Sequence, residues 1–377
     1  MEKSNEIDYR FKILYALAMI LVVDNHHPYS ISLLEDWFPA GSFHLALFMF
    51  GSGYFFNKKS LKNINGFILY KIKKLIIPLY LYTFSYAFIV ALSKNFGFSI
   101  GGEISLNNLL ISPINNGHAF VYNLAGWFIA PLFMVQVFSQ VIRKLLNKMI
   151  ERDMYYFCIS LVIGIFGNYL ACRGYYTGLW LVLTRFAYFI PFYELDILYR
   201  STLEKYDNKI PTFFYLVIIF LLQGLIIFIY KKPLTYRPVW TNNFENGPIM
   251  PIVVGIIGIA LWLRVAKIME PIIGKNKFVN AIADNTYSIM MNHLFGFMLL
   301  KGCFGLLAEF KLAFTDFDFA AFKSTIWYVY IPRGANQLLI LYTIVGIGFS
   351  IFVQKVINVF KNKFYIAKKY ESESGSV

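Results

Sequence analysis

Charged side chains are scarce in this sequence of 377 residues: Asp, Glu, Lys and Arg make up 15% of it. A soluble domain carries about 25% charged residues and about half apolar residues, whereas 58% of this chain is hydrophobic. The shortage of charge excludes a soluble enzyme and a disordered chain. Cysteines are also few. Cys158, Cys172 and Cys303 lie far apart, so we expect neither a disulfide framework nor a bound metal.

Long apolar runs are abundant instead. A helix needs about 20 apolar residues to cross a bilayer, and ten segments approach or reach that length. We therefore predict an all-α, polytopic membrane bundle of about ten transmembrane helices in one domain, residues 1–370, followed by a disordered tail, 371–377. The predicted spans lie near residues 11–27, 42–56, 75–92, 124–142, 155–172, 179–199, 211–230, 249–263, 282–302 and 337–354.

The distribution of basic residues predicts the orientation of these spans. With both termini placed in the cytoplasm, 25 of the 35 Lys and Arg residues fall in inside segments and eight in outside loops. Cytoplasmic loops are typically enriched in Lys and Arg. The net charge of +14 is thus a topology signal, and it requires no nucleic-acid partner. We expect a multi-pass protein of the plasma membrane whose immediate partner is the lipid bilayer.

The first predicted span ends in polar residues. We expect its helix to continue through His27 and to end at Pro28, because the apolar part alone is too short to cross the bilayer. Asp24, Asn25, His26 and His27 would then lie at membrane depth. No small-residue cleavage site follows this span, which argues against a signal peptide.

Three ionisable side chains on different spans are predicted to share one layer. At 1.5 Å per residue, His26 lies about 22 Å from the inner face, and His44 about 5 Å below the outer face. Arg185 lies about 9–10 Å below the outer face. Ionisable groups within a membrane are functional candidates, so this layer in the outer half of the bilayer is the predicted active site.

The chemistry of these side chains suggests their roles. His26 or His27 could act as a general base, since imidazole exchanges protons near pH 7; otherwise both are packing or interfacial residues. Asp24 could orient the His27 ring or cap the local backbone. Arg185 could stabilise an oxyanion or bind an acyl carrier, or form a structural ion pair with Asp24.

Basic residues also cluster at the inner end of the third span. Lys71, Lys73 and Lys74 suit phosphate recognition, although positive-inside signalling would equally explain them. Asp196 and Arg200, four residues apart, are expected to form a structural pair. His118 lies in an outside loop, and no role is assigned to it.

Five segments, in order, resemble the membrane acyltransferase-3 family and within it the sugar and exopolysaccharide O-acetylases. The resemblance rests on the histidine-ending first helix and on a second helix that carries His44. A basic stretch before the third helix, a helix led by Trp127 and a late helix that carries His293 complete the set. The matching segments are 21–27, 38–56, 71–78, 127–133 and 285–293.

This resemblance implies a bundle that moves an acyl group, usually acetyl, from cytoplasmic acetyl-CoA to a glycan hydroxyl at or beyond the outer face. By position, His26 matches the catalytic histidine and His44 the histidine of the second helix. Lys71, Lys73 and Lys74 match the basic cluster near the coenzyme A phosphates. Trp127 and His293 match recurrent positions, and we group them with His44 and Arg185 as oxyanion or substrate residues.

The chain departs from the family pattern in two places. The family usually has a basic residue eleven positions before its histidine, where this chain has Tyr15, or Ala16 if His27 is the base. Arg10 and Lys12 could substitute for it. Asp196 stands where the family usually has a small residue.

The sequence thus predicts a membrane O-acetyltransferase acting on a cell-envelope or exported polysaccharide. Two alternatives are a glycan exporter, with the histidines lining its path, and an inactive scaffold of polysaccharide biosynthesis. Neither the sugar nor the oligomeric state follows from the sequence.

Overall fold

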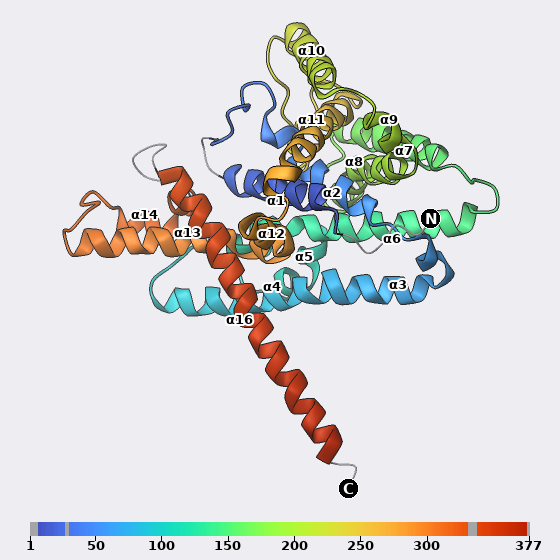
Figure 1. Cartoon of the computed structure of the whole chain (residues 1–377). Coiled ribbons are helices and arrows are strands. Elements are labelled where there is room, and N and C mark those ends of the chain that lie inside the picture. Colours follow the sequence, from blue (N-terminus) through green and yellow to red (C-terminus); the bar gives the residue numbers. More distant parts are fainter. Residues whose placement is uncertain (1–6, 27–29, 331–337, 375–377) are drawn as a thin grey trace.

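The structure, a computed structural model, describes residues 7–26, 30–330 and 338–374. Within these ranges it contains helices and no strand (Figure 1). The helices are α1 (Tyr9–Asp24), α2 (His44–Tyr54), α3 (Ile64–Lys71), α4 (Ile77–Asn95), α5 (Ser112–Asn115), α6 (Ile129–Leu146), α7 (Asp153–Cys172), α8 (Leu179–Leu198), α9 (Glu204–Asp207), α10 (Thr212–Tyr230), α11 (Met250–Ile273), α12 (Lys277–Asp284), α13 (Thr286–Glu309), α14 (Phe319–Ser324), α15 (Ile326–Tyr330) and α16 (Leu339–Ser374). A π-helical turn, η3 (Ile72–Ile76), joins α3 to α4, and a 3₁₀ segment, η5 (Val121–Phe128), leads into α6.

Helices α1, α2 and α8 form the centre of the bundle. Helix α1 packs against α2, α11, α12, α13 and α16, while α2 also packs against α8. Most side chains of α1 and α8 are buried, among them Phe11, Phe189 and Phe192. The candidate site residues of these helices are therefore surrounded by protein on nearly all sides.

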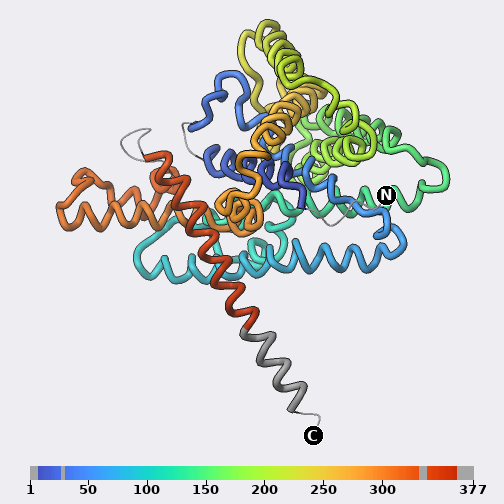
Figure 2. The backbone as a smooth tube through the Cα atoms, viewed as in Figure 1, coloured from blue at the N-terminus to red at the C-terminus, as the bar shows by residue number. Residues whose placement is uncertain are grey.

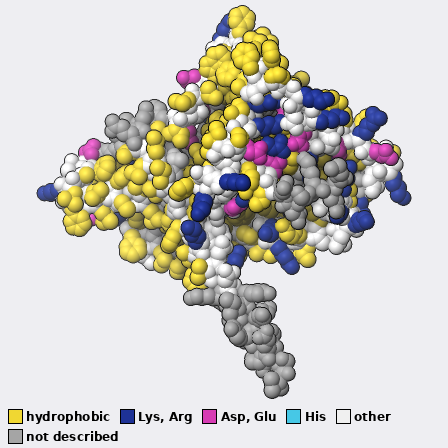
Figure 3. Space-filling view, viewed as in Figure 1, with side chains coloured by type: hydrophobic (Ala, Val, Ile, Leu, Met, Phe, Trp, Pro, Cys, Tyr) yellow, Lys and Arg dark blue, Asp and Glu magenta, His cyan; other side chains and the backbone are white. Residues whose placement is uncertain are grey.

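The outer helices are more apolar and less buried. Helix α10 has a mean hydropathy of 2.6 but only three buried residues, Ile219, Gln223 and Ile226. Hydrophobic side chains cover the surface over α10 and over the end of α13 (Figure 3), with Phe213, Leu221 and Phe310 strongly exposed. An exposed apolar surface of this extent fits contact with lipid.

Seven helical segments of the described chain are long and apolar enough to cross a membrane, and they correspond to seven of the ten predicted spans. Of the other three, α1 has 16 residues and α2 has 11. Helix α8 has 20 residues but carries Arg185, Glu194 and Asp196. An all-α protein with multiple membrane helices is confirmed, whereas the count of ten and the cytoplasmic position of both termini stay predictions.

Helices α1, α2 and α8 fall outside these limits for a common physical reason. A helix that is surrounded by other helices has little contact with lipid, so it tolerates polar residues and a short length. The three predicted spans that are too short or carry several charges are thus the central ones, and they include Asp24, His44 and Arg185.

The prediction that the first helix continues through His27 is wrong. Helix α1 ends at Asp24, and the amide of Asn25 caps it by donating to Leu21 O at 2.9 Å. The Asp24 carboxylate accepts from Ser30 Oγ at 2.6 Å and from the amide of Ile31 at 3.1 Å. Because this side chain binds Ser30 and Ile31, it favours the end of the helix at this point.

Close contact between α7 and α8 depends on two glycines. A Cβ atom at Gly167 would lie 2.2 Å from the Cβ of Ala187, and one at Gly164 would lie 2.6 Å from a ring carbon of Pro191. Small residues allow such close approach of helices in a membrane. This contact fixes α8, the helix that carries Arg185, against α7.

The C-terminal helix α16 packs along α13 and then extends beyond the bundle (Figures 1 and 2). Its backbone is helical as far as Ser374, which includes the first residues of the segment predicted to be a disordered tail. The last three residues, 375–377, lie outside the described residues.

Candidate active site

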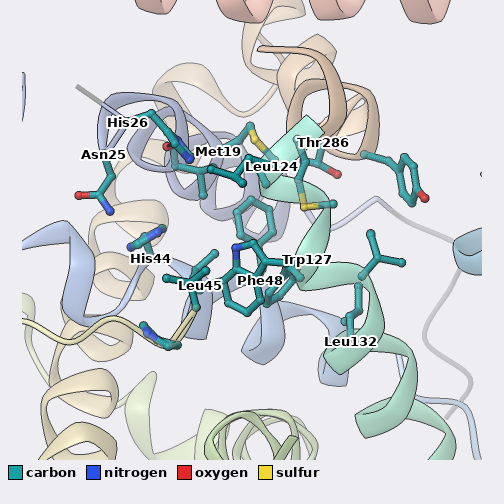
Figure 4. Close-up of a pocket in the computed structure, with 18 of the residues that line it drawn as sticks. Met19, Asn25, His26, His44, Leu45, Phe48, Leu124, Trp127, Leu132 and Thr286 are labelled. Atoms are coloured by element: carbon teal, nitrogen blue, oxygen red, sulfur yellow. Dashed lines mark hydrogen bonds between the residues drawn. The ribbon is translucent and has the colours of Figure 1, made fainter. Parts of the chain in front are cut away.

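A cavity of about 530 Å³ lies among α1, α2, η5, α13 and the loop before α11. Asn25, His26 and His44 gather at one end of it, and Thr286 and Leu132 lie at the other (Figure 4). The residues that line it include Tyr15, Met19, Val22, Asn25, His26, His44, Leu45, Phe48, Ser52, Leu75, His118, Leu124, Trp127, Gln136, Tyr236, Arg237, Trp240, Thr286, Tyr287 and Trp327. None of the described lining residues is an Asp or a Glu.

Three histidines of this region are anchored in the same way. In each ring Nδ1 lies against the carbonyl oxygen four residues earlier. The distances are 2.8 Å from His26 to Val22 O, 2.5 Å from His44 to Ala40 O and 2.7 Å from His293 to Ile289 O. A carbonyl oxygen only accepts a hydrogen bond, so Nδ1 carries the proton in all three rings and Nε2 carries the lone pair.

His293 supports His26 directly. Its Nε2 atom lies 3.3 Å from Nδ1 of His26, and the ring centroids are 4.8 Å apart. The lone pair on His293 Nε2 can accept from the same N–H that His26 offers to Val22. The arrangement holds His26 in the tautomer whose Nε2 atom is the basic one.

His44 lines the same cavity and is 6% exposed. With the proton on Nδ1, its neutral ring presents an acceptor rather than a donor at Nε2. In this tautomer it suits a hydroxyl group better than an oxyanion. His293 is fully buried behind His26 and does not line the cavity.

Asp24 and His27 were predicted as catalytic residues together with His26. Asp24 is 1% exposed and caps the following backbone, the second of the two roles left open by the sequence. His27 lies outside the described residues. Asn25, which the sequence analysis gave no role, lines the cavity next to His26.

Arg185 lies behind the cavity wall rather than in it. It is 1% exposed, and Nε donates to Val239 O at 2.9 Å while Nη1 donates to Asn116 O at 3.1 Å. Its guanidinium lies 4.6 Å from the centre of the Trp127 ring, and Trp127 in turn lines the cavity. No carboxylate among the described residues forms an ion pair with it, and Asp24 is bonded elsewhere.

His118, to which the sequence assigned no role, is part of the site. It lines the cavity, and its ring lies against that of Trp240, with centroids 4.5 Å apart and ring planes inclined by 33°. Burial and the nearby charge of Arg185 lower the pKa of the His118 imidazole to about 3. The signal in the sequence is Gly117, because glycine readily adopts the φ of 75° with which this loop lies against the backbone of Trp127 in η5.

The predicted lysine cluster lies near the other end of the cavity. Lys71 follows the aromatic residues of α3, while Lys73 and Lys74 are exposed in the π-helical turn η3. Pro78 lacks the N–H that would pair with the Lys74 carbonyl in a regular helix, which favours this wider turn. Leu75, in the same turn, lines the cavity, and its carbonyl accepts from Tyr287 Oη at 2.9 Å.

The basic residues near the position of Tyr15 are bound to carboxylates. Arg10 Nη2 lies 2.6 Å from Asp8 and 2.7 Å from Glu204, and Lys12 lies 2.8 Å from Asp284. Tyr15 itself lines the cavity. The missing basic residue is thus replaced at its own position by an aromatic side chain.

Asp196 and Arg200 hold the end of α2 rather than a substrate. Asp196 accepts from the amide of Tyr54 at 2.6 Å, and Arg200 donates to the Tyr54 carbonyl at 2.7 Å. Among the described residues, no group of three His, Cys, Asp or Glu side chains could hold a metal ion.

The fold and this cavity define a multi-helix membrane protein with a histidine site enclosed within its bundle. The model of the acyltransferase-3 family, described as an acyltransferase domain, matches residues 8–359, which is nearly the whole chain. The chain therefore belongs to the acyltransferase-3 family and is a membrane acyltransferase. No curated protein and no solved structure matches it significantly.

Proposed function

We propose that this acyltransferase moves an acetyl group from cytoplasmic acetyl-CoA to a hydroxyl group of a cell-envelope or exported polysaccharide, in the plasma membrane. One observation carries the proposal: a single cavity reaches from His26 and His44 to Leu75, which adjoins the lysine cluster. A donor bound by its phosphates at the lysines could extend its flexible arm through the bundle to the histidines.

In this proposal His26 is the general base. Its Nε2 atom takes the proton from the acceptor hydroxyl as the hydroxyl oxygen attacks the thioester carbonyl carbon. The tetrahedral intermediate then collapses, the carbon–sulfur bond breaks, and the coenzyme A thiolate takes the proton back from His26. A positioned acid–base group of this kind accelerates a reaction by about 10²–10⁴-fold.

Trp127 and Asn25 are the proposed oxyanion donors. The Trp127 side chain lines the cavity, and no hydrogen bond from its indole N–H to another described residue is present. The Arg185 guanidinium, 4.6 Å from the Trp127 ring, draws electron density from the ring and strengthens this donor. His44 Nε2 would accept a hydrogen bond from the acceptor sugar.

At the other end, Lys73 and Lys74 would bind the coenzyme A phosphates, with Lys71 beside them. Lysine binds phosphate as a mobile point charge and requires no fixed geometry. The exposure of Lys73 and Lys74 suits a ligand that enters from the cytoplasm.

Acyl analysis of the surface polysaccharide by NMR and mass spectrometry tests the proposal. The strains are a gene deletion and the deletion complemented with wild type, His26→Ala or His27→Ala, each equally expressed. We expect the deletion to lose an O-acetyl ester that wild type and His27→Ala restore and His26→Ala does not. Loss of the polymer from the surface with unchanged acetylation would favour export instead, and restoration by His26→Ala would refute the proposed base.

A further inference from the structure

Two loops close the end of the cavity that lies beside the histidines. One contains His118 and runs from α5 to η5; the other, between α10 and α11, contains Tyr236, Arg237 and Trp240. Both loops contact Arg185, which lies 69 residues after Asn116 of the first loop and 54 residues before Val239 of the second. A single side chain thus joins both parts of the cavity wall.

Arg185 is that side chain. It donates to Val239 O in one loop and to Asn116 O in the other, and each acceptor is within two residues of a cavity-lining aromatic ring, Trp240 or His118. Burying a guanidinium is costly unless its donors are satisfied. Here carbonyl oxygens of the two loops accept hydrogen bonds from these donors. Separation of the loops would therefore leave a buried guanidinium without its partners.

The two rings held in this way have features of a binding site. Trp240 is 43% exposed, and the His118 ring lies against it at an angle of 33°. Both ring nitrogens of His118 are buried and have no hydrogen-bond partner. Buried polar atoms are nearly always paired in native proteins, so a ligand in the cavity is a natural partner for them.

A sugar ring matches this chemistry. Its apolar face can stack on an indole ring, and its hydroxyl groups both donate and accept hydrogen bonds. A neutral imidazole offers one donor and one acceptor, and the low pKa of His118 keeps the ring neutral at physiological pH.

We propose that His118 and Trp240 form the acceptor subsite and take one saccharide ring, which they place next to His26, and that Arg185 is a positioning residue that holds the subsite together. This inference rests on the proposed function. It assigns the sugar to the loop end of the cavity and leaves the lysine end to the donor.

The test uses the purified full-length protein in lipid nanodiscs with radiolabelled acetyl-CoA. The acceptor is surface polysaccharide extracted from the gene-deletion strain. The variants are His118→Ala and Trp240→Ala. Trp180→Ala is the matched control, because Trp180 is also 43% exposed, lies at the start of α8 and does not line the cavity.

We expect His118→Ala and Trp240→Ala each to raise the KM for the polysaccharide about tenfold, equivalent to about 1.4 kcal/mol. The KM for acetyl-CoA should change by less than about twofold, because interactions with the donor remain. Trp240→Phe should recover part of the loss, since it keeps a stacking ring. Trp180→Ala should match wild type.

Equal KM values for the polysaccharide in Trp240→Ala, His118→Ala and Trp180→Ala would overturn the subsite. A wild-type protein that does not acetylate the polysaccharide would instead overturn the proposed function, and this inference with it.

Arg185→Lys tests the positioning role, with Arg185→Gln as a second variant. Lysine keeps the charge but cannot reach both loops. We expect Arg185→Lys to raise the polysaccharide KM in the wild-type background and to add little in the Trp240→Ala background, because the subsite is already lost there. Equal effects in both backgrounds would refute the positioning role.

Discussion

The two ends of the cavity hold their functional groups in opposite ways. At the histidine end, His26, His44 and His293 each bind a carbonyl oxygen four residues earlier, and all three rings are largely buried. At the lysine end, Lys73 and Lys74 are exposed. Proton transfer requires a fixed lone pair, whereas phosphate binding requires only charge near the ligand. The difference supports the proposed division, in which the histidine end carries out the chemistry and the lysine end binds the donor.

The largest expected effect follows from removing the fixed lone pair. His26→Asn keeps an amide N–H that can reach Val22 O but supplies no base. We expect kcat to fall by about 10²–10⁴-fold, with little change in thermal stability. The measurement is the acetyl-transfer rate of purified protein, with the melting temperature as the control for folding. A rate close to wild type would show that the histidine end does not carry the base.

A smaller loss is expected when only the support of the base is removed. His293→Leu deletes the acceptor for His26 Nδ1–H but leaves Val22 O in place. We expect kcat to fall about tenfold, and the acidic limb of the pH–rate profile to shift. His293→Gln, which can still accept a hydrogen bond, should retain more activity. An unchanged pH profile in His293→Leu would contradict the supporting role.

Substitutions at the lysine end should change the KM for acetyl-CoA rather than kcat. Charge removal by Lys73→Gln with Lys74→Gln should raise the KM for acetyl-CoA about three- to tenfold at low salt, and less at high salt. Lys62→Gln, also an exposed lysine in the polar segment before α3, is the matched control. A fall in kcat with unchanged KM would show that these lysines do not bind the donor.

The smallest effect is expected at Lys12, the residue that could replace the missing basic group near Tyr15. Lys12 pairs with Asp284, which is 58% exposed, and exposed pairs contribute about 0–1 kcal/mol. We expect Lys12→Gln to change the KM for acetyl-CoA by less than about twofold. A rise equal to that of the double lysine variant would make Lys12 part of the donor site.

The sequence contained enough information for the helices and for part of the site. Apolar runs predicted the seven lipid-compatible helices because lipid contact imposes length and composition directly. The depth of His26 and His44 was also informative, since both line one cavity. The same estimate of depth placed Arg185 in one layer with these histidines. It could not show that the Trp127 ring lies between Arg185 and the cavity.

Other features depend on single contacts made by loop residues. The end of α1 at Asp24 follows from hydrogen bonds to Ser30 and Ile31, which compete with continuation of the helix. His118 reaches the cavity only because Gly117 allows its loop to approach Trp127. Neither contact has a periodic pattern, and periodicity is the main signal that a single sequence offers.

The central claim is that one cavity serves a donor at its lysine end and an acceptor at its histidine end, on opposite sides of the membrane. Sealed vesicles of both orientations test it directly, because acetyl-CoA is too polar to cross a bilayer. With acetyl-CoA added outside, inside-out vesicles that enclose the polysaccharide should transfer acetyl groups to it, and right-side-out vesicles surrounded by the polysaccharide should not. Equal transfer in both orientations would contradict the division of the cavity into a donor end and an acceptor end.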